Sequence, residues 1–81
     1  MISCQLYDYI EIACMYHYQV EVTFHDQTTM QGRAMTTEIS KNKKEWLVLE
    51  QPDETIKVEM DKMISMRALT DNPHFEQVKF D

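Results

Sequence analysis

The spacing of apolar residues changes abruptly near Tyr18. On the N-terminal side, the residues that share one face at helical spacing are Ile10, Ala13, Cys14 and His17. On the C-terminal side, apolar residues alternate with polar ones, at Val20, Val22 and Phe24. The first spacing is typical of one face of an α-helix, and the second is typical of a strand with one buried face. The sequence therefore predicts a short helix followed by β-structure.

The predicted helix spans about residues 8–17. Asp8 is a good N-cap, and Glu11 follows three residues later, which is the spacing of a capping box with Asp in the cap position. His17 would then lie at the C-terminal end of the helix, where a cation interacts favourably with the helix dipole. We expect His17 to be a structural or surface residue rather than a catalytic one.

Several short strands are predicted between residues 19 and 68. Alternation and polar turns place them at about 20–24, 28–38, 45–50, 56–60 and 64–68. Gly32 is the one glycine of the chain, and glycine inside a strand often marks a bulge or a bend of a closing sheet. The segment 45–50 is apolar on both faces, so the N-terminal helix is expected to cover its second face. Asp61-Lys62 is a very tight connection.

A helix followed by about five short strands, with a tight link before the last one, is the order of the Sm-like, SH3-type small barrels. Residues 1–81 are therefore predicted to form one mainly β domain, a five-stranded Sm-like barrel preceded by a short α-helix, with an extended tail at 70–81. An OB-fold usually carries its helix between the third and fourth strands, where this sequence shows no helical pattern. A chain of 81 residues leaves no room for a second core.

Charge is distributed unevenly along the chain, whose formal net charge is −6. Residues 1–32 contain four acids and all four tyrosines, but no Lys or Arg. Such a surface repels a phosphate backbone, so direct binding of nucleic acid is disfavoured. It suits a basic protein partner, and tyrosine is enriched at interfaces. The alternatives are that the acids serve solubility alone and that the tyrosines seal the helix onto the barrel.

The sequence contains no known catalytic motif. It has no glycine-rich phosphate loop, nucleophile elbow or metalloprotease helix, so no enzyme activity, small-molecule substrate or cofactor is expected. Cys4, Cys14 and His17 are the only nearby candidates for metal ligands, and their spacing matches no common zinc pattern. No apolar run is long enough for a membrane span, and the first residues lack the features of an export signal. A cytoplasmic location is therefore expected.

Several short blocks of residues, at a particular spacing along the chain, are similar to those of a known family. They are Ile2-Ser3-Cys4, Tyr7-Asp8, Ile10-Glu11-Ile12-Ala13-Cys14, His17, Ser40-Lys41, Glu45-Trp46-Leu47-Val48 and Asp61-Lys62-Met63-Ile64-Ser65. Together they resemble the Rho-binding antiterminators, the Rof (YaeO) family, over about residues 2–66. The Cys-x-x-Tyr-Asp and Glu-Ile-Ala-Cys blocks are fairly specific at this spacing, whereas the strand segments alone are not.

The resemblance implies a fold, a partner and a set of contacts. Members of the family have an Sm-like barrel with an N-terminal helix, and they bind the transcription termination factor Rho at the primary RNA-binding site on its N-terminal OB domain. This would block RNA loading and inhibit Rho-dependent termination. Asp8 and Glu11 would face cationic residues of Rho, with Tyr7 beside them. Lys41 and Lys43 would contact a neighbouring acidic or backbone surface of Rho.

Two other functions stay open, an Sm-like RNA-binding protein and an adaptor subunit for another partner. RNA binding calls for a face rich in Lys and Arg, and none is readable here. The family pattern carries acids at the positions held by Gln5 and Leu6; if one of them is a main contact in relatives, this protein binds without it. Asp8 and Glu11 can cap the helix and also bind Rho only if their side chains stay partly exposed.

Overall fold

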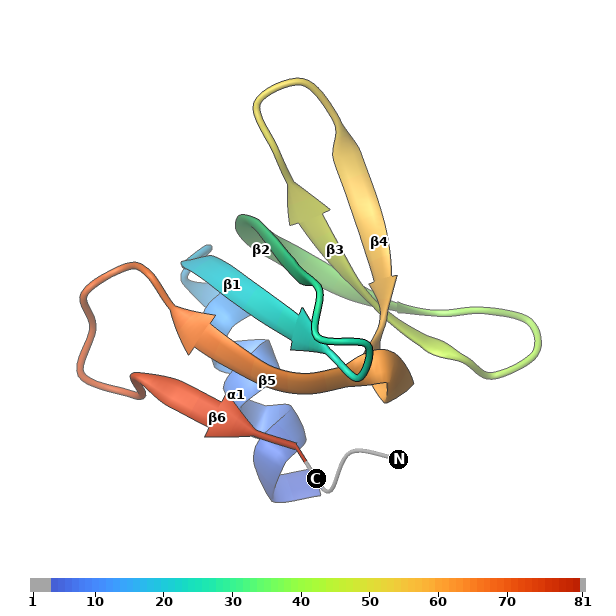
Figure 1. Ribbon diagram of the computed structural model, residues 1–81, viewed down its shortest axis with the longest axis horizontal. Helices are drawn as coiled ribbons and strands as arrows, with labels where there is room; N and C mark the ends of the chain where they lie inside the picture. The colour runs from blue at the N-terminus through green and yellow to red at the C-terminus, as the bar shows by residue number, and fades with distance from the viewer. Residues whose placement is uncertain (1–3, 81) are drawn as a thin grey trace.

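The computed structural model describes residues 4–80, which form one α-helix and a six-stranded antiparallel sheet (Figure 1). The elements are α1 (Cys4–Met15), β1 (Gln19–Phe24), β2 (Thr29–Ile39), β3 (Glu45–Glu50), β4 (Thr55–Glu59), the 3-10 helix η1 (Met60–Lys62), β5 (Met63–Ala68) and β6 (Gln77–Lys79). The predicted class, a mainly β fold with an N-terminal helix, is confirmed. The predicted tail contains a sixth strand, β6, which pairs with β5.

The strand order in the sheet is β4-β3-β2-β1-β5-β6. The sheet curls strongly, so that the β3–β4 hairpin stands away from β1 and β5 (Figure 1), but the strand pairs of the described residues do not close it into a complete ring. The tight link predicted at Asp61-Lys62 is η1, a single 3-10 turn that carries the chain from one edge of the sheet to the strand beside β1.

Gly32 lies near a bend, as predicted, but the irregularity itself is two to four residues further along. The pairing of β2 with β3 shifts register between Ala34 and Thr36. At Gly32, a Cβ atom would lie 2.9 Å from the Leu49 Cβ and 3.2 Å from the Glu50 carbonyl oxygen. Glycine is therefore required by the close approach of β2 and β3 and not by an unusual φ angle.

The helix begins at Cys4, so the predicted start at Asp8 is wrong. Leu6 packs against the core one turn before the fully buried Ile10 and thus extends the apolar stripe towards the N-terminus. Asp8 consequently lies inside the helix with an exposed side chain, and the capping box that it was expected to form with Glu11 is absent.

The C-terminal end of α1 has the two hydrogen bonds of a Schellman motif. The Tyr18 N–H donates to the Ala13 carbonyl (2.9 Å), and the His17 N–H donates to the Cys14 carbonyl (3.3 Å). His17 has a φ angle of 53°, the left-handed conformation that usually selects glycine, and its Nδ1 atom lies 3.0 Å from the Ala34 carbonyl oxygen of β2. The sequence predicts that His17 is a structural or surface residue. In the structure it ends the helix and contacts β2.

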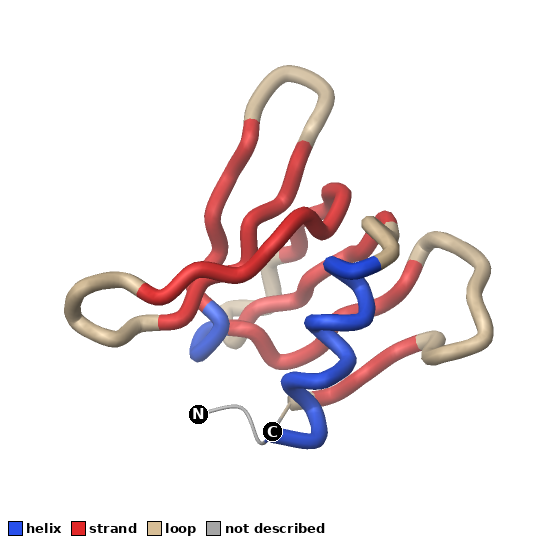
Figure 2. Tube along the Cα trace, turned by 180° about the vertical axis from the view of Figure 1, so that it is seen from behind, coloured by secondary structure: helices blue, strands red, loops and turns tan. Residues whose placement is uncertain are grey.

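The core is one cluster between α1 and the curled sheet (Figure 2). Its fully buried members come from the helix and from four strands: Ile10, Ala13, Val20, Val22, Ala34, Leu47, Leu49 and Met66. α1 packs mainly against β2 and also against β6. The sequence predicts that the helix covers β3, and buried residues of both elements belong to the same core cluster, with η1 also packed against β3.

Candidate partner-binding surfaces

The solvent-exposed face of α1 is acidic. Ile10 and Ala13 on the opposite face are fully buried, which directs Asp8, Glu11 and Met15 outward along one stripe. At 1.5 Å per residue, this stripe is about 10 Å long. Neither carboxylate takes part in an ion pair within residues 4–80. Asp8 and Glu11, here called the acidic face, are therefore available to a partner.

The four tyrosines near α1 have different environments. Tyr7 and Tyr9 are half-buried against the core, and Tyr9 meets the ring of Phe75 edge-on at 5.6 Å. Tyr18 is buried, whereas Tyr16 is 54% exposed. Tyr7 thus packs the helix against the core. The exposed part of its side chain belongs to the residue directly before Asp8. Tyr7 stays a predicted contact beside Asp8 and Glu11, and Tyr16, which the sequence did not single out as a contact, is the more exposed ring.

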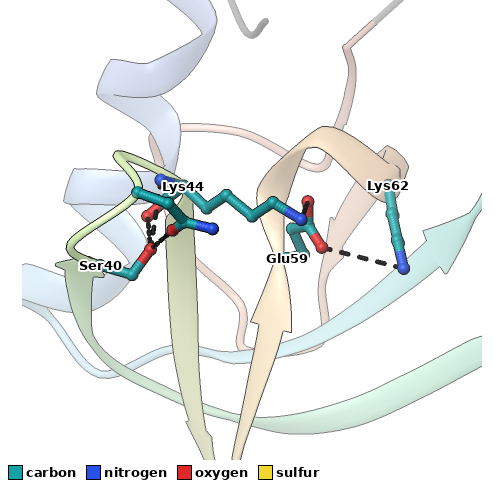
Figure 3. Close-up of polar contacts among 5 residues, drawn as sticks. Ser40, Lys44, Glu59 and Lys62 are labelled. Atoms are coloured by element: carbon teal, nitrogen blue, oxygen red, sulfur yellow. Dashed lines mark hydrogen bonds and ion pairs between the residues drawn. The ribbon is translucent and has the colours of Figure 1, made fainter.

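The second candidate surface is the loop between β2 and β3, where Ser40 organises the turn (Figure 3). The Ser40 hydroxyl donates to the side-chain oxygen of Asn42 and accepts the backbone N–H of Lys44 (3.2 Å). The Ser40 N–H donates to the Lys44 carbonyl, and the Lys43 N–H donates to the Ser40 carbonyl, both at 2.9 Å. A φ angle of 65° at Lys43 completes the turn. The loop therefore has one well-defined shape.

The lysines of this loop differ in whether they form an ion pair with Glu59. The Glu59 carboxylate lies 3.5 Å from the Lys44 ammonium and 3.8 Å from the Lys62 ammonium, and its side chain is only 14% exposed (Figure 3). Lys41 and Lys43 are exposed and make none of the ion pairs found among the described residues. Lys41 and Lys43, here called the basic tip, are the two cations of the loop whose charges are uncompensated.

The acidic face and the basic tip are separate. Figures 1 and 2 show the β2–β3 loop projecting from the sheet, while α1 lies across the sheet's face. No ion pair within the described part of the chain joins Asp8 or Glu11 to Lys41 or Lys43. The five residues predicted as contacts therefore form two surfaces of opposite charge instead of one continuous site.

The Cys14 thiol of α1 is held in its protonated form. Burial and the neighbouring Glu11 raise the pKa of the Cys14 thiol to about 11, so that this thiol is protonated and a poor nucleophile at neutral pH. Within residues 4–80, no group of three or more His, Cys, Asp or Glu side chains could hold a metal ion. No helix in the same range is long and apolar enough to cross a membrane.

Comparisons with known proteins converge on one family. The family model described as "Modulator of Rho-dependent transcription termination (ROF)" matches residues 1–80. The chain is 33% identical over 64 residues to Protein rof of Escherichia coli K12, which covers 79% of this chain and 75% of the relative, and the figures for Protein rof of Shigella flexneri are the same. It also resembles the structure titled YaeO bound to magnesium from Vibrio cholerae O395, with a TM-score of 0.85 and 37% identity over 93% of this chain and 97% of that one.

Proposed function

This chain belongs to the ROF family of modulators of Rho-dependent transcription termination, and from that membership we propose that it inhibits termination by occupying Rho's primary RNA-binding site. The acidic face carries this proposal. Asp8 and Glu11 are exposed, lie on one stripe and have no counter-charge among residues 4–80. A site that binds RNA must be basic in order to neutralise phosphates, and two unpaired carboxylates on a rigid helix complement such a site.

The charge distribution supports this assignment over direct binding of RNA. The first 32 residues contain no Lys or Arg, and the arginines of β2 and β5 are engaged by acids: Arg33 lies 3.7 Å from Glu50, and Arg67 lies 3.1 Å from Glu21. An RNA strand laid along the acidic face of α1 would therefore meet carboxylates. A basic groove of a protein is the better complement.

The basic tip supplies a second contact in this proposal. Lys41 and Lys43 would approach an acidic or backbone surface of Rho next to the OB domain, while the acidic face enters the RNA site. The Ser40 turn and the Glu59 ion pairs hold the loop in one shape before binding, which lowers the conformational entropy lost in the complex. Two separate charged surfaces also define the orientation of the protein on Rho, because only one pose satisfies both.

The proposed mechanism needs occupancy alone. The whole chain acts as one domain without a cofactor or a chemical step, in the cytoplasm where it would meet Rho. Inhibition is then complete when the RNA site of Rho is filled, and it is reversed when RNA is in excess, because the two ligands compete for one site.

Competition with RNA tests the proposal directly. Purified Rho is mixed with a fluorescently labelled pyrimidine-rich RNA, and the fluorescence anisotropy is followed as this protein is added. We expect the RNA to be displaced, with a midpoint that rises in proportion to the RNA concentration. RNA that stays bound to Rho at saturating protein would disprove the proposal. Titration of the same RNA with this protein in the absence of Rho tests the alternative of an RNA-binding protein.

A further inference from the structure

Three rings from distant parts of the chain form a cluster where α1 ends. Tyr16 lies 5.6 Å from Tyr18 and 5.3 Å from His74 between ring centroids, and both pairs are within 17° of parallel. Tyr18 and His74 are 6.5 Å apart. Because Tyr18 is 7% exposed and Tyr16 is 54% exposed, Tyr16 and the exposed His74 form the outer surface of this aromatic cluster.

The cluster is held in place by the loop between β5 and β6, which Figure 1 shows beside the start of β1. The side-chain oxygen of Asn72 accepts the backbone N–H of His74 (2.8 Å), and its amide donates to the Thr70 carbonyl (2.8 Å). The Thr70 hydroxyl in turn accepts the N–H of Gln19 in β1 (2.8 Å). These hydrogen bonds hold the backbone of the loop at His74 close to β1, and the His74 ring stacks on Tyr16 in the unbound protein.

The segments that carry the cluster are apolar and acidic. Met15 directly precedes Tyr16 and is 69% exposed, and Leu69, at the start of the loop that holds His74, is 40% exposed. The loop contributes Asp71 and Glu76, and residues 68–78 contain no Lys or Arg. The carbonyl end of α1, which carries partial negative charge, is at the same place. An exposed aromatic surface in a negative field favours a planar cation.

We propose that the cluster of Tyr16, Tyr18 and His74 accepts an arginine side chain of a basic protein partner, with the guanidinium stacked on the ring of Tyr16. Arginine fits better than lysine, because its guanidinium is planar and weakly hydrated and stacks on aromatic faces. A nucleobase could also stack on a ring, but its phosphates would be repelled by Asp71 and Glu76 of the same loop.

This inference rests on the proposed function, since it makes Rho the partner and extends its contact along the helix. Asp8, Glu11 and Met15 lie on one stripe of α1, and Tyr16 follows directly at the end of that helix. Along the helix axis Tyr16 is about 7–12 Å from the two acids, so a basic surface seated on the acidic face would reach the aromatic cluster. The cluster would serve as the apolar anchor of an interface whose other contacts are charged.

Substitution of Tyr16 separates stacking from charge. We expect Tyr16→Ala to weaken binding of the full-length protein to Rho by about two- to thirtyfold, whereas Tyr16→Phe, which keeps the ring, stays near the wild-type affinity. Thermal unfolding followed by circular dichroism confirms that each variant is folded at the temperature of the assay. Wild-type affinity of a folded Tyr16→Ala variant, or equal losses for both variants, would overturn the inference.

A second measurement identifies the cation. N-acetyl-arginine amide and N-acetyl-lysine amide are titrated separately while the ring proton resonances of Tyr16 and His74 are followed by NMR. Larger shifts with the arginine probe are expected, and equal shifts would overturn the assignment to a guanidinium. If wild-type protein displaces RNA from Rho and Tyr16→Ala displaces it equally well, only this inference fails. If wild-type protein does not displace RNA, both it and the proposed function fail.

Discussion

The Leu49 side chain of β3 lies so close to Gly32 of β2 that a Cβ atom on the glycine would be 2.9 Å from the Leu49 Cβ. Leu49 is fully buried and its Cβ is attached to the backbone of β3, so it cannot move aside without shifting the strand. This approach lies just before the register shift in β2, where the sheet curls. The curvature of the sheet thus depends on the absence of a side chain at one position.

Gly32→Ala is expected to destabilise the protein by about 1–3 kcal/mol, the usual cost of overpacking a well-filled core. Urea unfolding followed by circular dichroism measures the change. Thr29→Ala in the same strand is the control, because Thr29 is exposed and its substitution removes no core contact. A Gly32→Ala variant as stable as wild type would show that the two strands are not in close contact in solution.

We expect the protein to be more stable with glycine than with alanine at position 17. The His17 φ angle of 53° is unfavourable for every residue with a Cβ, by roughly 1 kcal/mol, and both substitutions remove the contact of Nδ1 with the Ala34 carbonyl equally. His17→Gly should therefore be about 1 kcal/mol more stable than His17→Ala in urea unfolding. At His25, an exposed turn residue with ordinary φ, the same pair should show no preference for glycine. A reversed order at position 17 would contradict the left-handed helix end.

Glu59→Gln is expected to loosen the β2–β3 loop. The substitution removes the charge that holds Lys44 and Lys62, and an ion pair of this exposure contributes at most about 1 kcal/mol to stability. Faster amide hydrogen exchange in residues 40–44 is the expected result. Glu54→Gln, at an exposed acid without an ion pair among the described residues, should leave the exchange unchanged. Unaltered exchange in both variants would argue against a role for Glu59 in ordering the loop.

Glu21 is expected to contribute to acid sensitivity. Hydrogen bonds from Gln31 (2.9 Å) and Arg67 (3.1 Å) hold the pKa of Glu21 below its ordinary value of 4.5. A carboxyl with a lower pKa in the folded state stabilises the protein above the unfolded-state pKa, and this contribution is lost as the pH falls through the folded-state value. Glu21→Gln should therefore flatten the decline of stability below about pH 5, measured by urea unfolding across pH. A Glu21→Gln variant whose stability declines with pH as steeply as that of the wild type would contradict this role of Glu21.

Reversing the charges of Asp8 and Glu11 to lysine is expected to weaken binding to Rho by tenfold or more while leaving stability within about 0.5 kcal/mol. Both side chains are exposed and unpaired within the described residues, so nothing in the fold is lost. The variant Asp53→Lys, Glu54→Lys carries the same change of net charge on the β3–β4 turn and should bind nearly as wild type. Equal losses in the two double variants would mean that net charge, not the acidic face, governs affinity.

The strands were predictable because their pattern is local. The run of apolar residues at 45–50 gave the bounds observed for β3, and the other strands of the predicted barrel differ by about one residue at their ends. The helix start was misplaced because Asp8 has the properties of an N-cap, while Leu6 continues the apolar stripe a further turn. β6 was treated as a tail, because its pairing with β5 depends on a loop shaped by Asn72.

The candidate surfaces were predictable only in part. The exposure of Asp8 and Glu11 follows from helical spacing once Ile10 and Ala13 are recognised as buried. The separation of free from paired lysines at residues 41–44 did not follow, because Glu59 comes from another strand. The contact of Tyr16 with His74 joins residues far apart in the sequence, and no short-range pattern indicates it.

Because the helix does not use Asp8 as its cap, that side chain has no role in starting the helix. Under the proposed function, substitutions at this position change the strength of binding without selecting against the folded state. The same holds for Lys41 and Lys43, since Lys44 alone makes the ion pair that orders their loop. Relatives that face a different variant of the partner can therefore adapt through these positions one at a time, on an unchanged scaffold.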